Sequence, residues 1–286
     1  MEAPPPGWVP PSALRRARPQ ALETTADTNK SLLQTMFPGF AFDTVLVALS
    51  AVELATYGAL ICFLPTVGQG YPTLCGLYSW GAAYAPQIAS GALWRLLAPT
   101  FLHASFSHVL TNVIFQLRLG FSVEESLGHW RFAVLYFTTG AFGSLMSAAM
   151  TPQTVAVGAS TSALGLLGAL LARAYLGETA QSHGLAVSSI AILILVNSGP
   201  QADVFGHLGG LLAGFLLYIV LHKGETSPGH LRGTALAALA TFTLIGSVEL
   251  HKLAGMTPEA LGMMSRCPGM LTNVATGAAK VGSAMQ

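Results

Sequence analysis

Charged residues are scarce in this sequence. Asp, Glu, Lys and Arg make up 9% of its 286 residues, whereas hydrophobic residues make up 52%, and the mean hydropathy is +0.58. Soluble domains carry about 25% charged residues, so the composition excludes an ordinary soluble domain and predicts an integral membrane protein. The formal net charge of +1 also lacks the basic excess on which nucleic-acid binding depends. We therefore expect the lipid bilayer as a partner and no nucleic acid.

Cysteine is also rare, and the histidines lack metal-ligand spacing. The chain has three cysteines, and Cys62 and Cys75 would pair only if both faced an oxidising compartment, so we expect free thiols. His103 and His108 are five residues apart and would point to different sides of a helix. No cysteine or carboxylate completes a zinc site, so we expect no metal and no cofactor.

Long apolar stretches define the organisation of the chain. Residues 1–40 are rich in proline and arginine and lack the apolar core of a signal peptide, which predicts a disordered cytoplasmic tail. We expect an all-α, polytopic membrane protein with a six-helix core over 41–222 and a seventh helix and tail over 223–286. The stretches predicted to be helical are 44–64, 104–122, 132–150, 155–172, 184–197, 204–221 and 234–250.

Two further expectations follow from the positions and lengths of these stretches. With the N-terminus in the cytoplasm, nine of the 13 Lys and Arg residues fall on the cytoplasmic side, as the positive-inside rule requires. The C-terminus would then be lumenal or extracellular. The stretch 184–197 covers only about 20 Å, against a hydrocarbon core of about 30 Å, which suits either a mobile gate or a tilted segment in a thinned bilayer.

Ser160 and His207 are polar residues inside apolar stretches, where a side chain without a role is penalised. Ser160 follows Gly158 and would begin a helix, so the free N–H groups of the first turn would face a developing oxyanion. His207 lies beside a stripe formed by Gly206, Gly210 and Gly214, spaced for close helix contact. The sequence predicts that the two helices touch and that the serine and histidine form a nucleophile and base. The alternative interpretations are a serine–glycine packing seam for Ser160 and, for His207, a histidine hydrogen-bonded to a backbone carbonyl.

Other polar residues suit supporting positions. His108 and Asn112 share a helix face and are candidate oxyanion donors, or they hold helices together. Asp203 would orient His207 or, as we favour, cap the helix that begins after it. Glu124 is assigned to structural ion pairs and caps in a cytoplasmic loop, and Glu53 to a buried hydrogen bond.

In order along residues 94–221, these motifs resemble the rhomboid family of intramembrane serine proteases. The matching motifs are Trp94-Arg95, His103, His108 with Asn112, Gly120 with Glu124 and Gly128, Arg131-Phe132, Gly158-Ala159-Ser160, and His207 with Gly209, Gly210 and Gly214.

The resemblance implies a catalytic dyad without a required carboxylate. Ser160 would be the nucleophile and His207 the base, while His108, Asn112 and the Ser160 backbone N–H would form the oxyanion hole. The substrates implied are single-span transmembrane proteins. Thr161 and Leu164 depart from the glycine and the aromatic residue usual in the family, so the imidazole would be held less firmly.

A seventh helix after the core is similar to the eukaryotic secretory-type arrangement, which implies the secretory pathway or the plasma membrane. The main alternative is a non-catalytic rhomboid-like protein that binds transmembrane clients. A transporter would show inverted repeats, which the sequence lacks.

Overall fold

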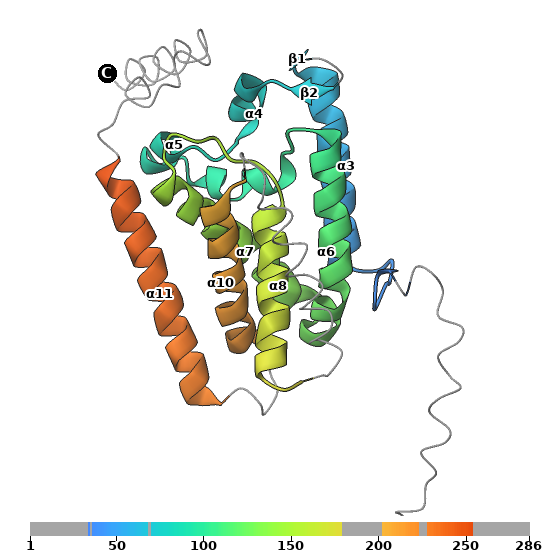
Figure 1. Cartoon of the computed structure of the whole chain (residues 1–286), viewed down its shortest axis with the longest axis vertical. Helices are drawn as coiled ribbons and strands as arrows, with labels where there is room; N and C mark the ends of the chain where they lie inside the picture. The colour runs from blue at the N-terminus through green and yellow to red at the C-terminus, as the bar shows by residue number, and fades with distance from the viewer. Residues whose placement is uncertain (1–33, 35, 68–69, 179–201, 223–227, 254–286) are drawn as a thin grey trace, which may run out of the picture.

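The structure is a computed structural model that describes residues 34, 36–67, 70–178, 202–222 and 228–253. It is an almost entirely helical bundle, which confirms the expected all-α, polytopic membrane fold (Figure 1). Among the described residues, four helices are long and apolar enough to cross a membrane. The long helices are α3 (Val45–Phe63), α6 (Phe106–Leu127), α7 (His129–Met150), α8 (Ser160–Tyr175), α10 (Val204–Leu221) and α11 (Gly229–Lys252).

The predicted apolar stretches match these helices to within a few residues, and 204–221 coincides with α10. Three boundaries differ, and the end of α6 is taken up below with Glu124. Helix α8 begins at Ser160 instead of residue 155, because Gly158 has a φ of +125° and breaks the helical path before it. Helix α11 begins at Gly229, directly after Pro228, a residue suited to the edge of a helix. The stretch 184–197 lies outside the described residues, as does nearly all of the predicted tail.

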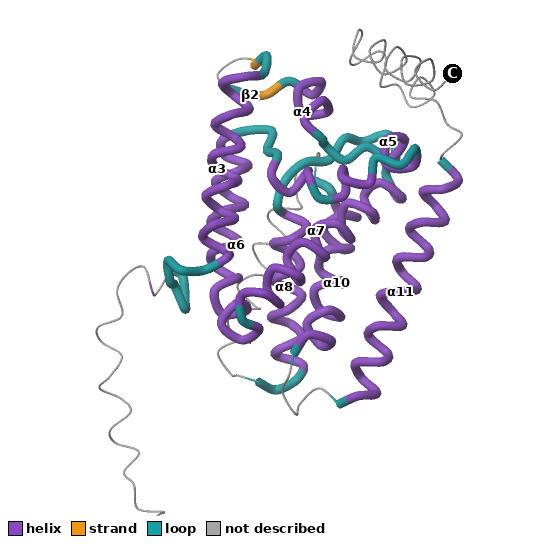
Figure 2. Tube along the Cα trace, turned by 180° about the vertical axis from the view of Figure 1, so that it is seen from behind, coloured by secondary structure: helices purple, strands orange, loops and turns teal. Residues whose placement is uncertain are grey.

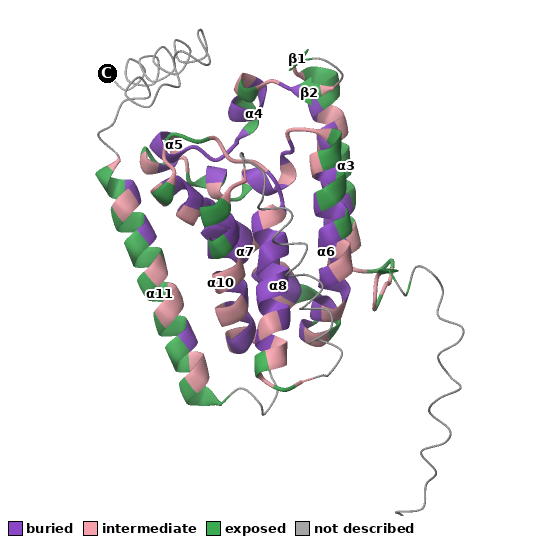
Figure 3. Cartoon of the chain, viewed as in Figure 1, coloured by how far each residue is buried: buried purple, intermediate pink, exposed green. Residues whose placement is uncertain are grey.

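Helix α8 occupies the centre of the bundle. It is buried along most of its length (Figure 3) and packs against α6, α7 and α10. Its 16 residues rise only about 24 Å, less than a hydrocarbon core of about 30 Å. A short helix is tolerated there because its N-terminal end begins in the interior of the protein, where neighbouring segments and not lipid surround it.

Helices α3 and α11 form opposite edges of the bundle, as the front and back views agree (Figure 2). Helix α11 packs on α7 and α10, with Gly246 beside the Leu145 side chain. Leu236, Leu244 and Ile245 are among its exposed apolar residues. In a membrane protein these side chains suit contact with lipid.

Short elements cover one end of the bundle and form a cap layer (Figures 1 and 2). They connect α3 to α6. The cap layer consists of β1 (Thr66–Val67), β2 (Tyr71–Pro72), α4 (Leu74–Trp80), α5 (Ala85–Ala89) and the 3-10 helices η2 (Leu93–Leu96) and η3 (Ala98–Phe101); β1 and β2 pair antiparallel, with Thr66 opposite Pro72.

Arg95 is the central polar residue of the cap layer. Its Nη1 donates hydrogen bonds of 2.8 Å to the carbonyls of Tyr78 and Ala82, and its guanidinium lies over the rings of Tyr78 and Trp94, 4.7 and 4.8 Å from their centroids. Burial lowers the pKa of Arg95 from its ordinary value, yet guanidinium stays protonated in proteins. Arg95 therefore fixes the path of the chain from α4 to η2.

The expectation that Cys62 and Cys75 are free thiols holds for only one of the two residues. Cys62 is a free thiol, as predicted, but Cys75 in α4 is disulfide-bonded, so the prediction of a free thiol is wrong there. Cys267 lies outside the described residues.

Glu124 lies within α6, and not in a loop as expected, because α6 continues to Leu127 and only Gly128 separates it from α7. The buried carboxylate accepts hydrogen bonds from the backbone N–H groups of Val45 and Leu46, at 2.7 and 3.0 Å. It also lies 2.6 Å from Nδ1 of His129. Glu124 thus satisfies the free N–H groups at the start of α3, which agrees with its assignment to caps and ion pairs.

Candidate active site

The segment before α8 is irregular backbone that the cap layer holds in place. Ala83 and Ala156 exchange backbone hydrogen bonds of 2.9 and 3.0 Å, and the Gly158 N–H donates to the Pro99 carbonyl at 2.9 Å. Irregular backbone at membrane depth needs such partners because lipid offers none. These bonds place Ser160 as the first residue of α8.

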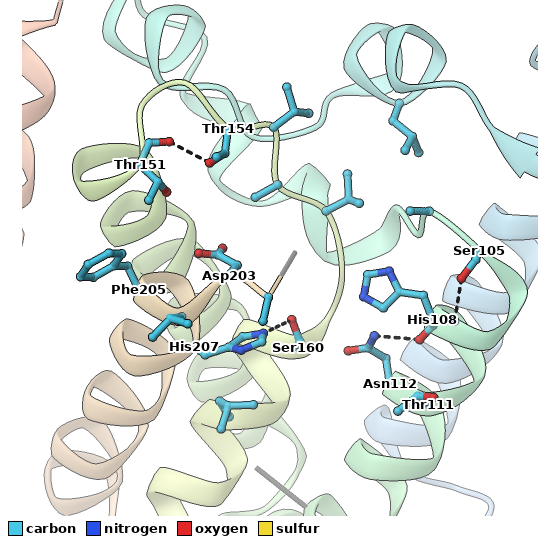
Figure 4. A pocket seen from close by; sticks show the side chains of 18 of the residues that line it. Ser105, His108, Thr111, Asn112, Thr151, Thr154, Ser160, Asp203, Phe205 and His207 are labelled. Carbon is cyan, nitrogen blue, oxygen red and sulfur yellow. Dashed lines mark hydrogen bonds between the residues drawn. The ribbon is translucent and has the colours of Figure 1, made fainter. Parts of the chain in front are cut away.

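Ser160 and His207 lie side by side at the ends of two adjacent helices. His207 is in the first turn of α10, and its Nε2 is 2.8 Å from Ser160 Oγ (Figure 4). This distance permits direct proton transfer from the hydroxyl to a neutral imidazole. The structure therefore brings the predicted nucleophile and base together.

Glycines on α10 make this approach possible. A Cβ on Gly210 would fall against the carbonyl oxygen of Thr161, and a Cβ on Gly214 against that of Gly165. Both glycines therefore let the backbones of α8 and α10 touch, as the spacing of small residues indicates. The contact fixes the register of the two helices and hence the separation of Ser160 and His207.

Gly158 leaves a space open between Ser160 and the helix α6. A Cβ on Gly158 would lie 2.8 Å from Nε2 of His108 and 3.7 Å from Oγ of Ser160. The residue's positive φ independently favours glycine. The space next to the hydroxyl thus borders a ring nitrogen that can carry a proton and donate it in a hydrogen bond, an arrangement suited to an oxyanion.

Asn112 lies one turn beyond His108 on α6, and both face Ser160 across the cavity (Figure 4). The Asn112 amide donates one hydrogen bond, of 2.8 Å, to the His108 carbonyl. An amide has two N–H donors, so the second is available for a ligand. The predicted oxyanion donors therefore line the same cavity as the serine.

The rings of His103 and His108 were expected to point to different sides of a helix, and the structure shows instead that they are in contact. Because α6 begins at Phe106, His103 precedes the helix, and its ring packs edge-on against His108 with centroids 5.1 Å apart, where a continuous helix would separate them. Burial lowers the pKa of His103 to about 3, so the ring is neutral at physiological pH. Its Nε2 accepts a hydrogen bond of 3.4 Å from the N–H of Ala159, and His103 thereby supports the segment before Ser160.

The cavity around these residues has a volume of about 820 Å³. Sequence reasoning missed two of its walls, the side chains of Leu74 and Leu77 from α4 and the segment 154–157. The sequence between the predicted helical stretches 132–150 and 155–172 gave no sign that the chain returns to the cap layer there. The walls are mostly apolar, while Ser160, His207, His108 and Asn112 converge inside, a combination typical of ligand sites.

Asp203 is the N-cap of α10. Its Oδ1 accepts a hydrogen bond of 2.9 Å from the N–H of Gly206, which confirms the favoured capping assignment. The carboxylate also lines the cavity near His207 (Figure 4). Asp203 therefore fixes the helix end that carries the histidine.

Comparisons with known proteins agree with this architecture. Residues 90–224 match the Rhomboid domain family. The chain is 38% identical over 200 residues to Rhomboid-like protease 1 of Toxoplasma gondii, covering 67% of this chain and 68% of that relative. Rhomboid-like protease 3 of the same organism is 34% identical over 212 residues, covering 71% and 80% of the two chains. RHOMBOID-like protein 7 of Arabidopsis thaliana is 32% identical over 164 residues, covering 55% and 51%.

The chain belongs to the rhomboid family. It is accordingly an integral, multi-pass membrane protein whose relatives include proteins named as proteases.

The two departures from the family pattern have structural counterparts in this rhomboid. The side chain of Thr161 packs against Gly143 of α7, where a Cβ on that glycine would collide with it. Leu164 is buried and lines the cavity one turn beyond Ser160. The Thr161 side chain therefore fits between α8 and α7 because the residue that faces it on α7 is a glycine.

Proposed function

We propose that this protein is an intramembrane serine endopeptidase that uses Ser160 and His207 as a catalytic dyad. The observation that carries the proposal is the 2.8 Å contact between Ser160 Oγ and His207 Nε2 inside a cavity of a membrane protein. Ser160 attacks the peptide carbonyl while its proton passes to Nε2 of His207. The protonated ring then gives the proton to the leaving amine, which leaves an ester on Ser160.

Hydrolysis of the ester reverses these roles. His207 takes a proton from water, the hydroxide attacks the ester carbonyl, and the proton returns to Ser160. In both steps the carbonyl oxygen becomes negative. His108, the Asn112 amide and the Ser160 N–H at the start of α8 are placed to stabilise it.

The substrates we propose are single-span transmembrane proteins. A regular helix keeps its carbonyls in backbone hydrogen bonds, so a substrate segment must unwind before Ser160 can reach it. Glycine or proline near the cut weakens a helix and should favour cleavage.

We also propose an orientation. The excess of Lys and Arg on one side favours a cytoplasmic N-terminus. The disulfide at Cys75 supports a non-cytoplasmic cap layer, and the cavity lies beside that layer. The C-terminus would then face the lumen or the exterior of the secretory pathway or plasma membrane.

The test compares cleavage of tagged transmembrane segments by the wild type, Ser160→Ala and the control Ser162→Ala. Ser162 is a buried serine on the same helix turn that faces Gly140 of α7. Ser160→Ala should lower kcat by about 10⁴-fold or more, whereas Ser162→Ala should retain most activity. A fluorophosphonate should label Ser160 in the wild type. Wild-type cleavage by Ser160→Ala would refute the proposal, and an unlabelled, inactive wild type would favour a non-catalytic client-binding protein.

A further inference from the structure

Three polar side chains form a closed ring between α3, α6 and α7. Glu53, Gln116 and Tyr136 are all fully buried. The Tyr136 oxygen lies 2.8 Å from Glu53 Oε1 and 2.6 Å from Gln116 Oε1, and Gln116 Nε2 lies 3.0 Å from Glu53 Oε2. None of the three takes part in the proposed chemistry, so the buried carboxyl of Glu53 requires another explanation.

The protonation state of Glu53 follows from counting protons around the ring. Each of the three contacts has hydrogen-bond length and needs one proton between its two heavy atoms. The Tyr136 phenol supplies one. The Gln116 amide supplies one, because only one of its two terminal atoms carries hydrogens. The third must therefore come from the carboxyl group of Glu53.

The count does not depend on how the Gln116 amide is oriented. If its oxygen and nitrogen are exchanged, the nitrogen donates to the Tyr136 oxygen, and the amide oxygen faces Oε2 of Glu53. That contact then needs a proton on Glu53. With an ionised Glu53, either orientation leaves two oxygens in contact without a proton between them.

We propose that Glu53 is a neutral carboxylic acid and that the ring it closes positions α6. Gln116 lies on α6 and shares a face with Asn112 and His108, four and eight residues before it. The ring therefore attaches to α3 and α7 the same face that carries the candidate oxyanion donors. A neutral acid also suits a membrane interior far better than a carboxylate does. The positioning role rests on the proposed function, whereas the protonation state does not.

A second contact reinforces the attachment to α3. Nε2 of Gln116 also lies 2.9 Å from Oγ of Ser50, whose hydroxyl donates to the Leu46 carbonyl at 2.9 Å. The ring and Ser50 together connect two turns of α3 to one residue of α6. Motion of α6 along its axis would therefore break several buried hydrogen bonds at once.

Glu124 provides a matched contrast because it is a second buried carboxyl on the same group of helices. The contacts described for it are with two backbone N–H groups and the His129 ring, and backbone N–H groups only donate. That environment suits a carboxylate. The same substitution should therefore have opposite effects at positions 53 and 124.

The test of the protonation state is Glu53→Gln beside Glu124→Gln. The new amide at position 53 can donate to the Tyr136 oxygen and accept from Gln116, so the ring is preserved. Glu53→Gln should keep the wild-type unfolding temperature and a kcat/KM within about twofold, and it should remove the infrared band of a protonated carboxyl at neutral pH. Glu124→Gln should keep that band and unfold at a lower temperature.

The test of the positioning role is Tyr136→Phe, which removes the phenol from the ring. We expect kcat to fall by about tenfold with KM nearly unchanged, because the oxyanion donors shift relative to Ser160. A folded Tyr136→Phe with wild-type kcat would overturn this role. Absence of the band from the wild type, or a Glu53→Gln that unfolds as Glu124→Gln does, would overturn the neutral acid. Failure of the proposed function would instead appear as cleavage by Ser160→Ala.

Discussion

Gly210→Ala should separate the serine from the histidine by inserting a single methyl group. A Cβ at this position would press on the backbone carbonyl of Thr161, which belongs to α8 and cannot rotate away as a side chain can. The two helices must therefore move apart, and Thr161 directly follows Ser160. The substitution leaves Ser160 and His207 themselves unchanged.

The contact geometry indicates the size of the effect. Real Cβ atoms almost never approach other heavy atoms within 3.0 Å, so α8 and α10 must open by about 1 Å, a displacement that typically lowers a rate by about 10²-fold. Overpacking of this kind also destabilises the fold by about 1–3 kcal/mol. Because alanine is a better helix former than glycine by about 1 kcal/mol, the net loss of stability should be smaller than the catalytic loss.

The assay is cleavage of a transmembrane substrate alongside thermal unfolding, with Gly233→Ala as the control. Gly233 lies on α11, where a Cβ would meet nothing within 4 Å. The control should keep wild-type activity and equal or higher stability. If a folded Gly210→Ala cleaved at the wild-type rate, close contact of α8 and α10 would not set the geometry of the dyad.

Three further variants test the surroundings of the dyad. Gly158→Ala places a methyl group between Ser160 and His108 and should lower kcat by about 10²-fold or more; wild-type kcat would show that no oxyanion occupies this space. Arg95→Lys cannot keep both hydrogen bonds of the guanidinium and should destabilise the fold by about 1.5–3 kcal/mol, measured by thermal unfolding; an unchanged unfolding temperature would contradict that role. The pKa of His103 falls from 6.5 to about 3 on burial, so the neutral ring stabilises the fold above about pH 6.5, and this stability is lost as the pH falls toward 3. The unfolding temperature of His103→Gln should depend less on pH between 6.5 and about 3 than that of the wild type. An unchanged pH dependence would contradict the lowered pKa of His103.

The sequence was sufficient to predict the six long helices in the described part of the chain and the contact of α8 with α10, because both depend on patterns within single segments. Apolar stretches long enough to span a bilayer marked the helices, and glycines four residues apart marked the close face of α10. The relation between His103 and His108 was not predictable in this way. It depends on the non-helical backbone between His103 and the start of α6 at Phe106, which the sequence pattern does not reveal.

The cap layer escaped prediction for a different reason. Its elements are too short to show a helical or strand period, and its decisive contacts join backbone atoms, such as those of Ala83 and Ala156, that side-chain patterns do not reveal. The hydrogen-bonded ring that contains Glu53 could not be predicted from the sequence either. The sequence showed a lone acid in an apolar stretch, while its partners Gln116 and Tyr136 lie far along the chain.

The position of Ser160 depends on these hidden contacts. A nucleophile at membrane depth must lie at a helix end to be reached, and a helix end has backbone groups that lipid cannot satisfy. Here the backbone groups immediately before Ser160 form hydrogen bonds with Ala83, Pro99 and His103. All three of these residues come from the connection between α3 and α6. That connection therefore allows α8 to begin in the interior of the protein, at the point where its first hydroxyl meets His207.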